Sequence, residues 1–194
     1  MDAAERLFAE RGIEAVSLRT INAEAGYSVA ALHYHFGTRD GLVRALLERA
    51  QPPMLRARAA LLAPLSASDA PALEAIVEAL VRPLTAGMRE DFPASLARLR
   101  FLVRLYFDRS PYLTRTLEES LAVFRPLLRR TLPQLDVRSL TRRWLLAVDL
   151  AQQALANAAV HLDCAPGESP RGADFEHFVR QLVLLITAGL RAPG

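Results

Sequence analysis

The sequence predicts an all-α protein in which an N-terminal three-helix helix-turn-helix domain precedes a C-terminal helical bundle. Three observations predict this fold class. Apolar residues recur at helical spacing along most of the 194 residues, and no period-two alternation is long enough for a strand. Prolines, glycines and capping residues divide the chain into helix-sized segments, about nine in total. We expect a DNA-binding domain over residues 1–45 and a ligand-binding and dimerisation domain over residues 46–194.

The first three predicted helices begin and end at residues suited to helix termini. Gly12 fits the end of a short first helix as a glycine in the left-handed conformation. Ser17 is a good N-cap for a second helix, and Gly26 permits a tight turn after it. Ser28 is expected to cap a third short helix that ends near His35.

A fourth, longer helix is expected after Thr38, which serves as its N-cap. Gly41 stands where a capping box would place an acidic residue. Pro52 and Pro53 are expected to break or kink this helix, because proline lacks an amide hydrogen and clashes with the preceding turn. The stretch Pro64–Pro71, rich in alanine, proline and serine, is the clearest linker candidate.

The remainder of the chain is predicted to form a bundle of five or six helices. Apolar-rich segments at helical spacing cover about residues 72–90, 94–107, 112–131, 137–162 and 174–191. Breaks are expected at 91–93, 110–111 and 132–133 and in the polar loop 164–172.

Composition and charge exclude several classes of protein. The net charge is +3, but residues 1–50 hold six arginines and seven acidic residues, so the basic excess lies in the rest of the chain. The single cysteine, Cys164, excludes an intrachain disulfide and a cysteine-rich zinc site. No catalytic triad, Cys/His pair, phosphate-binding loop or metal-ligand spacing is present, so we expect no enzyme, cofactor or metal. Without a leader or membrane-spanning stretch, the expected location is the cytoplasm.

The N-terminal 50 residues resemble a known family. The segment LFAERGIEAVSLRTINAEAGYSVAALHYHFGTRDGLVRALL is similar to the DNA-binding domain of the TetR family of bacterial transcription regulators. Within it, AGYSVAALHYHFGTRDGL is similar to the family pattern AGVSxGxLYxHFxSKxxL. The resemblance covers about a quarter of the chain with unbroken spacing. It implies a homodimeric transcription regulator, a repressor, that binds a palindromic double-stranded DNA operator and is released by a small apolar or amphipathic ligand.

The resemblance also implies which residues contact DNA. The third helix would lie in the major groove, where its mostly apolar first turn favours contacts with thymine methyl groups. The N-terminus of the fourth helix combines free amides, a positive dipole and a cation, which suits a phosphate. Gly37 replaces a residue that is often basic in the family. The predicted contact residues are Ser17, Arg19, Ser28, Val29, Ala30, His33, Tyr34, Thr38 and Arg39.

A ligand pocket is expected among aromatic and polar residues of the bundle. Asp149, Gln153, Asn157 and His161 form a polar stripe that belongs either to a solvated face or to a cavity. The aromatic candidates are equally compatible with plain core, and nearby arginines would suit an acidic ligand. The predicted pocket residues are Arg98, Phe101, Arg104, Leu105, Tyr106, Phe107, Phe124, Trp144, Gln153 and Asn157.

The last helices are expected to form the dimer interface, by resemblance to the four-helix interfaces of the family. The final segment carries an apolar stripe wider than a surface helix needs, with Val183, Leu184 and Leu190 beyond one face. The predicted interface residues are Leu155, Ala159, Phe178, Leu182, Leu185, Ile186 and Gly189.

Three other functions agree with the same sequence. A regulator of this fold could act without a ligand, or it could act as an activator. The third alternative belongs to another functional class: an all-helical enzyme or lipid-binding bundle whose helix-turn-helix has no role in DNA binding. A pocket containing a buried acid–base pair would favour the enzyme.

Overall fold

The computed structural model describes residues 1–26, 34–113 and 121–193, and within these ranges it contains ten helices and no strand. The predicted all-α fold class is therefore confirmed. The helices are α1 (Asp2–Arg11), α2 (Leu18–Ala25), α4 (Arg39–Ala67), α5 (Leu73–Val81), η1 (Arg82–Thr85), α6 (Phe92–Phe107), α8 (Phe124–Thr131), α9 (Val137–Ala156), α10 (Ala158–His161) and α11 (Gly172–Arg191).

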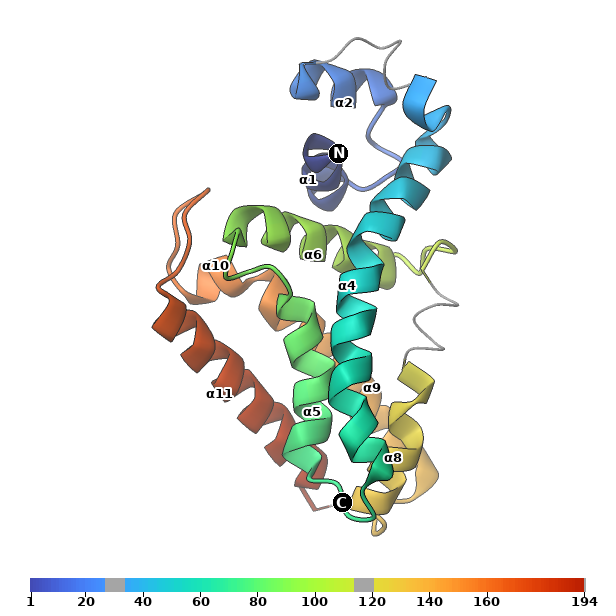
Figure 1. Cartoon of the computed structure of the whole chain (residues 1–194), viewed down its shortest axis with the longest axis vertical. Helices are drawn as coiled ribbons and strands as arrows, with labels where there is room; N and C mark the ends of the chain where they lie inside the picture. Colours follow the sequence, from blue (N-terminus) through green and yellow to red (C-terminus); the bar gives the residue numbers. More distant parts are fainter. Residues whose placement is uncertain (27–33, 114–120, 194) are drawn as a thin grey trace.

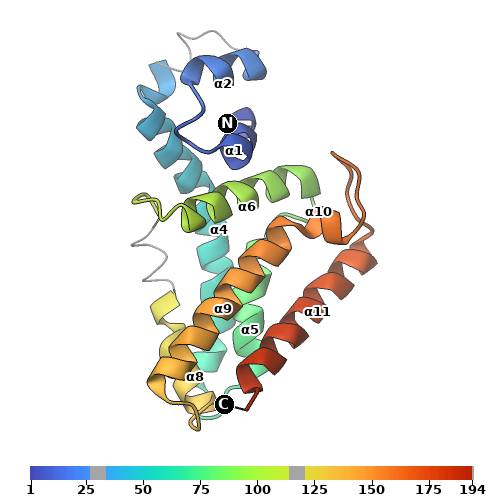
Figure 2. The ribbon, with the colours of Figure 1, turned by 180° about the vertical axis from the view of Figure 1, so that it is seen from behind.

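The molecule is elongated, with the N-terminal helices at one end (Figure 1). Helices α1 and α2 and the first turns of α4 form that end, and α6 crosses beneath α1. The rest of α4 runs down the molecule beside α5. Seen from behind, α9 and α11 lie next to each other along the other side of the bundle (Figure 2).

Helix α6 contributes to both hydrophobic cores of the protein. Phe101 and Leu105 are buried with α1, α2 and the first half of α4, and the Phe101 ring stacks on Phe8 with a centroid separation of 6.1 Å. Leu99 and Val103 are buried in the core of the C-terminal bundle. The N-terminal helices are therefore completed by side chains from residue 101 onward, far along the chain.

Helix α4 is continuous where the sequence predicts a break. Pro52, Pro53 and Pro64 all lie inside it, so the expected linker at 64–71 begins only at Ser68. The predicted break at 52–53 is therefore wrong, while the predicted alternative of a kink stays a prediction. Proline removes helical hydrogen bonds, but α4 is packed on the N-terminal core before the prolines and on the C-terminal core after them. The predicted domain boundary at 45/46 lies within this same helix.

The glycines after α1 and α2 differ in conformation. Gly26 is left-handed, with φ 69° and ψ 19°, at the place where the sequence predicts a tight turn. Gly12 also has a positive φ of 81°, but its ψ of 159° lies outside the left-handed helical region, so that part of the prediction is wrong. A side chain at Gly12 would approach the guanidinium of Arg104 on α6, with its Cβ 3.2 Å from Nη2. The turn after α1 is shaped by contact with α6.

Candidate functional site

Helices α1 and α2 and the first turns of α4 form an N-terminal unit. Two helix N-termini lie exposed in this unit, and each is capped by a predicted DNA-contact residue. The Ser17 hydroxyl accepts a hydrogen bond from the Thr20 amide at 3.0 Å, at the start of α2. The Thr38 hydroxyl accepts one from the Gly41 amide at 3.1 Å, at the start of α4. Both N-caps are confirmed. Because the remaining free amides and the helix dipole favour anions, each terminus suits a phosphate oxygen.

Gly41 explains why α4 lacks the acid of a capping box. A Cβ at this position would lie 2.1 Å from the backbone oxygen of Phe36. The same oxygen accepts a hydrogen bond from the Thr38 amide at 2.7 Å, across a turn in which Gly37 has a φ of +65°. The chain therefore approaches the first turn of α4 too closely for any side chain at residue 41.

We expect Gly41→Ala to lower the free energy of unfolding by more than about 1 kcal/mol, since the added methyl group forces the Phe36 carbonyl to move. Urea denaturation followed by circular dichroism measures the change. Gly172→Ala is the matched control, because its Cβ would have no neighbour within 4 Å. A Gly41→Ala protein as stable as the parent would contradict this packing.

Arg19 and Tyr34 are available to a partner on the same unit. Arg19 is exposed and makes no hydrogen bond or ion pair within the described ranges. Tyr34 is 87% exposed, and its ring meets His35 edge-on at 5.3 Å. A guanidinium and a phenol of this kind contact phosphates and base edges well. Ser28, Val29, Ala30 and His33 lie outside the described residues, so their predicted contacts stay predictions.

Arg39 has partners inside the protein. Its guanidinium pairs with the Glu14 carboxylate at 2.5 Å and donates to the backbone oxygens of Ile13 and Glu14 at 3.3 Å. Arg39 thus holds the loop between α1 and α2 against the start of α4. This loop brings the Glu14 carboxylate beside Arg39, one of the predicted DNA-contact residues. The phosphate contact predicted for Arg39 would have to coexist with this ion pair.

A buried carboxylate joins the N-terminal unit to the bundle, a contact that was not predicted from the sequence. Glu5 on α1 is 1% exposed, and its Oε2 lies 2.8 Å from Nη2 of Arg49 on α4. Its Oε1 lies 3.7 Å from Nε of Arg98 on α6. Arg49 also pairs with Asp2 at 2.8 Å. Arg98, predicted to meet a ligand, therefore contacts α1.

Four predicted pocket residues meet at one hollow. Arg104 and Phe107 of α6 face Gln153 of α9 and Asn157, the residue that follows α9, across a shallow depression of about 390 Å³. The Asn157 amide donates to the Gln153 backbone oxygen, and Arg104 pairs with Asp108 at 2.7 Å. The polar stripe of α9 thus lies at the surface here.

The other predicted pocket residues lie elsewhere. Phe101 and Leu105 belong to the N-terminal core. The Tyr106 hydroxyl donates to Asp149 at 2.8 Å, and burial, followed by this hydrogen bond, raises the pKa of Tyr106. Phe124 is buried beneath Trp144, with ring centroids 4.9 Å apart, and Trp144 borders a groove between α8 and α9.

Arg58 is a buried cation that the sequence analysis missed. It is 4% exposed, its guanidinium lies 6.0 Å from the centre of the Phe124 ring, and burial lowers its pKa to about 10. Its position could have been read from the spacing, because Met54, Arg58 and Leu62 lie on one face of α4.

The predicted interface residues divide between core and surface. Leu155, Leu182 and Ile186 are buried in their own bundle, while Ala159 and Phe178 are half-buried. Leu185 is 60% exposed, and Gly189 is exposed as well. Further exposed apolar residues on α9, α10 and α11, absent from the prediction, are Leu146, Leu150, Val160 and Leu184.

The described ranges contain no cluster of three or more potential metal ligands. None of the helices in those ranges has the length and hydrophobicity that a membrane crossing requires. Cys164 is half-buried.

Comparisons with known proteins agree with this arrangement. Residues 1–46 match the family model described as bacterial regulatory proteins, tetR family. Residues 78–189, more than half of the chain, match the tetracyclin repressor-like C-terminal domain. Together the two matches cover both ends of the molecule.

Individual relatives are named as regulators. The chain is 33% identical over 103 residues to the HTH-type transcriptional repressor Rv3405c of Mycobacterium tuberculosis and, equally, to the HTH-type transcriptional regulator Mb3439c of Mycobacterium bovis. The match spans 52% of this chain and half the length of each relative. In fold, the chain is similar to the crystal structure of a probable transcriptional regulatory protein, RHA5900, with a TM-score of 0.67 and 23% identity over 99% of this chain and 97% of the other.

Proposed function

This chain belongs to the TetR family of bacterial regulatory proteins, and from that premise we propose that it is a homodimeric repressor that binds a palindromic DNA operator and is released by a small amphipathic ligand. One curated relative is named a repressor, which supports this direction of regulation. A DNA partner would place the protein in the bacterial cytoplasm. Family membership also argues against the enzyme alternative, since the family consists of regulators.

The exposed N-termini of α2 and α4, together with Arg19 and Tyr34, carry the DNA-binding part of the proposal. Ser17 and Thr38 place free amides at the surface of one small unit, and Arg19 and Tyr34 are exposed on that unit. Amides and a cation anchor phosphates, and such contacts would hold the predicted third helix, which begins at Ser28, in the major groove. The N-terminal unit needs no net positive charge for this, because the contacts are local.

An exposed apolar surface on α9, α10 and α11 supports dimerisation. Val160, Leu146 and Leu185 are 68%, 67% and 60% exposed, and α9 packs against α11. Such a surface on neighbouring helices is suited to a second copy related by a two-fold axis. The two DNA-binding units would then reach successive major grooves, roughly 34 Å apart.

We expect Leu146→Glu combined with Leu185→Glu to convert the dimer to a monomer, because two carboxylates in each copy would be buried in the interface. Light scattering coupled to size-exclusion chromatography measures the mass. Val123→Glu is the control, since Val123 is 49% exposed at the start of α8 and does not belong to the apolar surface on α9, α10 and α11. A doubly substituted protein that remains dimeric would place the interface elsewhere.

Release by a ligand needs a second conformation in which the two DNA-binding units have the wrong separation. To shift occupancy from almost all bound to almost all free, the ligand must favour that conformation by about 5.5 kcal/mol. Helix α6 connects the bundle to α1 through the Phe101–Phe8 stack and the Arg98–Glu5 ion pair. A ligand that shifted α6 would therefore move α1.

Selection of bound DNA from a random pool, using the purified chain, tests the proposed function. We expect enriched sequences with two inverted half-sites whose centres are about 10 base pairs apart or a multiple of that. Recovery of asymmetric sequences, or no enrichment over several rounds, would refute a dimeric operator-binding protein.

A further inference from the structure

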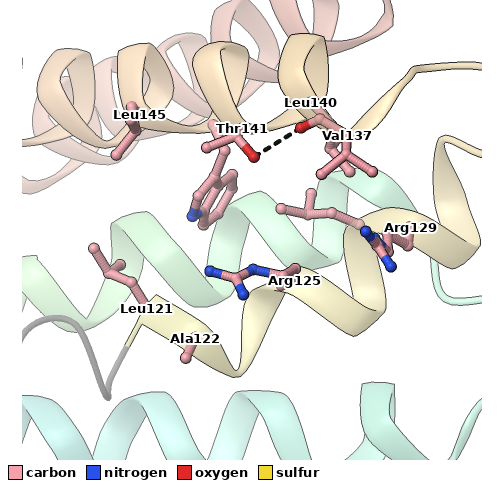
Figure 3. A pocket seen from close by; sticks show the side chains of 10 residues that line it. Leu121, Ala122, Arg125, Arg129, Val137, Leu140, Thr141 and Leu145 are labelled. Carbon is pink, nitrogen blue, oxygen red and sulfur yellow. Dashed lines mark hydrogen bonds between the residues drawn. The ribbon is translucent and has the colours of Figure 1, made fainter.

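A groove of about 560 Å³ runs between α8 and α9, at a distance from the N-terminal unit. Figure 3 shows Arg125 and Arg129 on α8 opposite Val137, Thr141 and Leu145 on α9. The volume lies within the range of small-molecule sites, which is about 300–1,000 Å³. None of the ten residues predicted for a pocket borders this groove except Trp144.

The free polar groups of this groove are hydrogen-bond donors. Arg125 and Arg129 lie one helical turn apart, both are exposed, and neither has an ion pair or hydrogen bond within the described ranges. The indole Nε1 of Trp144 is buried and lacks an acceptor there. The Thr141 hydroxyl is already bonded to the Val137 backbone oxygen at 2.8 Å. No acidic residue is among the described residues that line the groove.

The rest of the lining is apolar. Leu121 and Leu128 come from the α8 side, and Leu140 and Leu145 come from α9. Trp144 is 8% exposed and rests on the buried ring of Phe124, so the base of the groove is fixed by the core. The hydrocarbon part of a ligand could therefore pack on the leucine and indole surfaces while its anionic group contacts the two guanidinium groups.

The groove is separate from the surface proposed for dimerisation. At 100° per residue, Val137, Thr141 and Leu145 lie on one side of α9, whereas Leu146 and Leu150 lie on the opposite side. A second copy covering Leu146 and Leu150 would thus leave the groove accessible.

We propose that this groove binds an amphipathic carboxylate, with the carboxylate between Arg125 and Arg129 and the hydrocarbon on Trp144 and the leucines. Two guanidinium groups that pair with no acid of the described residues favour an anion over a neutral molecule of the same shape. That such binding also releases DNA rests on the function proposed above, whereas the binding itself does not.

Trp144 is the single tryptophan of the chain, so its fluorescence reports directly on this groove. Titration of the 194-residue chain with decanoate should give a saturable change in emission. Decanol should bind at least about fivefold more weakly, because it has the same hydrocarbon and no charge. Equal affinity for the two compounds, or no saturable change with decanoate, would overturn the proposal.

Variants of the two arginines test the anion site separately. Arg125→Gln combined with Arg129→Gln should weaken decanoate binding to the level of decanol while leaving decanol binding unchanged. Arg142→Gln, which removes an exposed arginine of α9 that does not line the groove, should bind decanoate like the parent. A double variant that keeps the preference for decanoate would show that these arginines do not hold the carboxylate.

The two proposals fail in distinguishable ways. If decanoate binds as described but does not release the selected DNA, the groove is a carboxylate site, and release of DNA through this groove is refuted. If the protein binds a palindromic operator but Trp144 does not respond to decanoate, the proposed function stands and the groove proposal falls.

Discussion

Phe101→Ala is expected to lower the free energy of unfolding by about 3–5 kcal/mol, the usual cost of removing a buried phenylalanine. Phe101 is fully buried and stacks on Phe8 of α1, although it belongs to α6. The substitution should therefore destabilise the N-terminal unit most. DNA binding should disappear at temperatures where the C-terminal bundle is still helical. Chemical denaturation and operator binding, measured on the same preparation, reveal both effects.

Phe107→Ala supplies the matched control. Phe107 lies on the same helix but is 41% exposed, so its removal leaves little cavity. We expect a stability change of less than about 1 kcal/mol and unaltered operator binding. If Phe101→Ala unfolded no more easily than Phe107→Ala, α6 would not be part of the N-terminal core.

The second large effect is expected on DNA affinity. Arg19→Ala combined with Tyr34→Ala should weaken operator binding at least roughly 100-fold with little change in stability, because hydrogen bonds to charged groups contribute about 1.5–3 kcal/mol each. Both side chains are exposed, so neither supports the fold. Fluorescence anisotropy with the selected operator measures the affinity.

Two further variants make this experiment specific. Arg142→Ala removes an exposed arginine from α9 and should leave operator affinity unchanged. Arg39→Ala should also weaken operator binding. Because this substitution removes the ion pair that holds the Glu14 loop, we expect the stability of the variant to fall together with its operator affinity. An unchanged affinity in the Arg19/Tyr34 double variant would refute the assignment of this surface.

The sequence predicted best the features that depend on neighbouring residues. Ser17 and Thr38 cap helices as expected because an N-cap hydrogen bond spans only three residues. Gly26 ends α2 at the expected turn for the same local reason. The resemblance to the family rests on an equally local pattern over residues 25–42, and the family comparisons bear it out.

Features that join distant residues were not predictable in this way. The partners of Arg39 and Arg98 are 25 and 93 positions away in sequence, and helical spacing does not encode such pairings. Likewise, Pro52 and Pro53 remain helical because separate cores hold α4 on both sides of them. On α11, an apolar stripe that covers more than one face does not reveal that Leu182 is buried and Leu185 exposed.

The dependence of operator affinity on salt tests DNA binding by this surface most directly. The logarithm of the binding constant should fall linearly with the logarithm of the salt concentration, by about 0.9 for each phosphate neutralised. Arg19→Ala removes one cation from each copy, so in a dimer it should reduce the steepness of that line by about 2. A binding constant independent of salt, or a slope that Arg19→Ala leaves unchanged, would contradict DNA binding through Arg19 and the helix N-termini beside it.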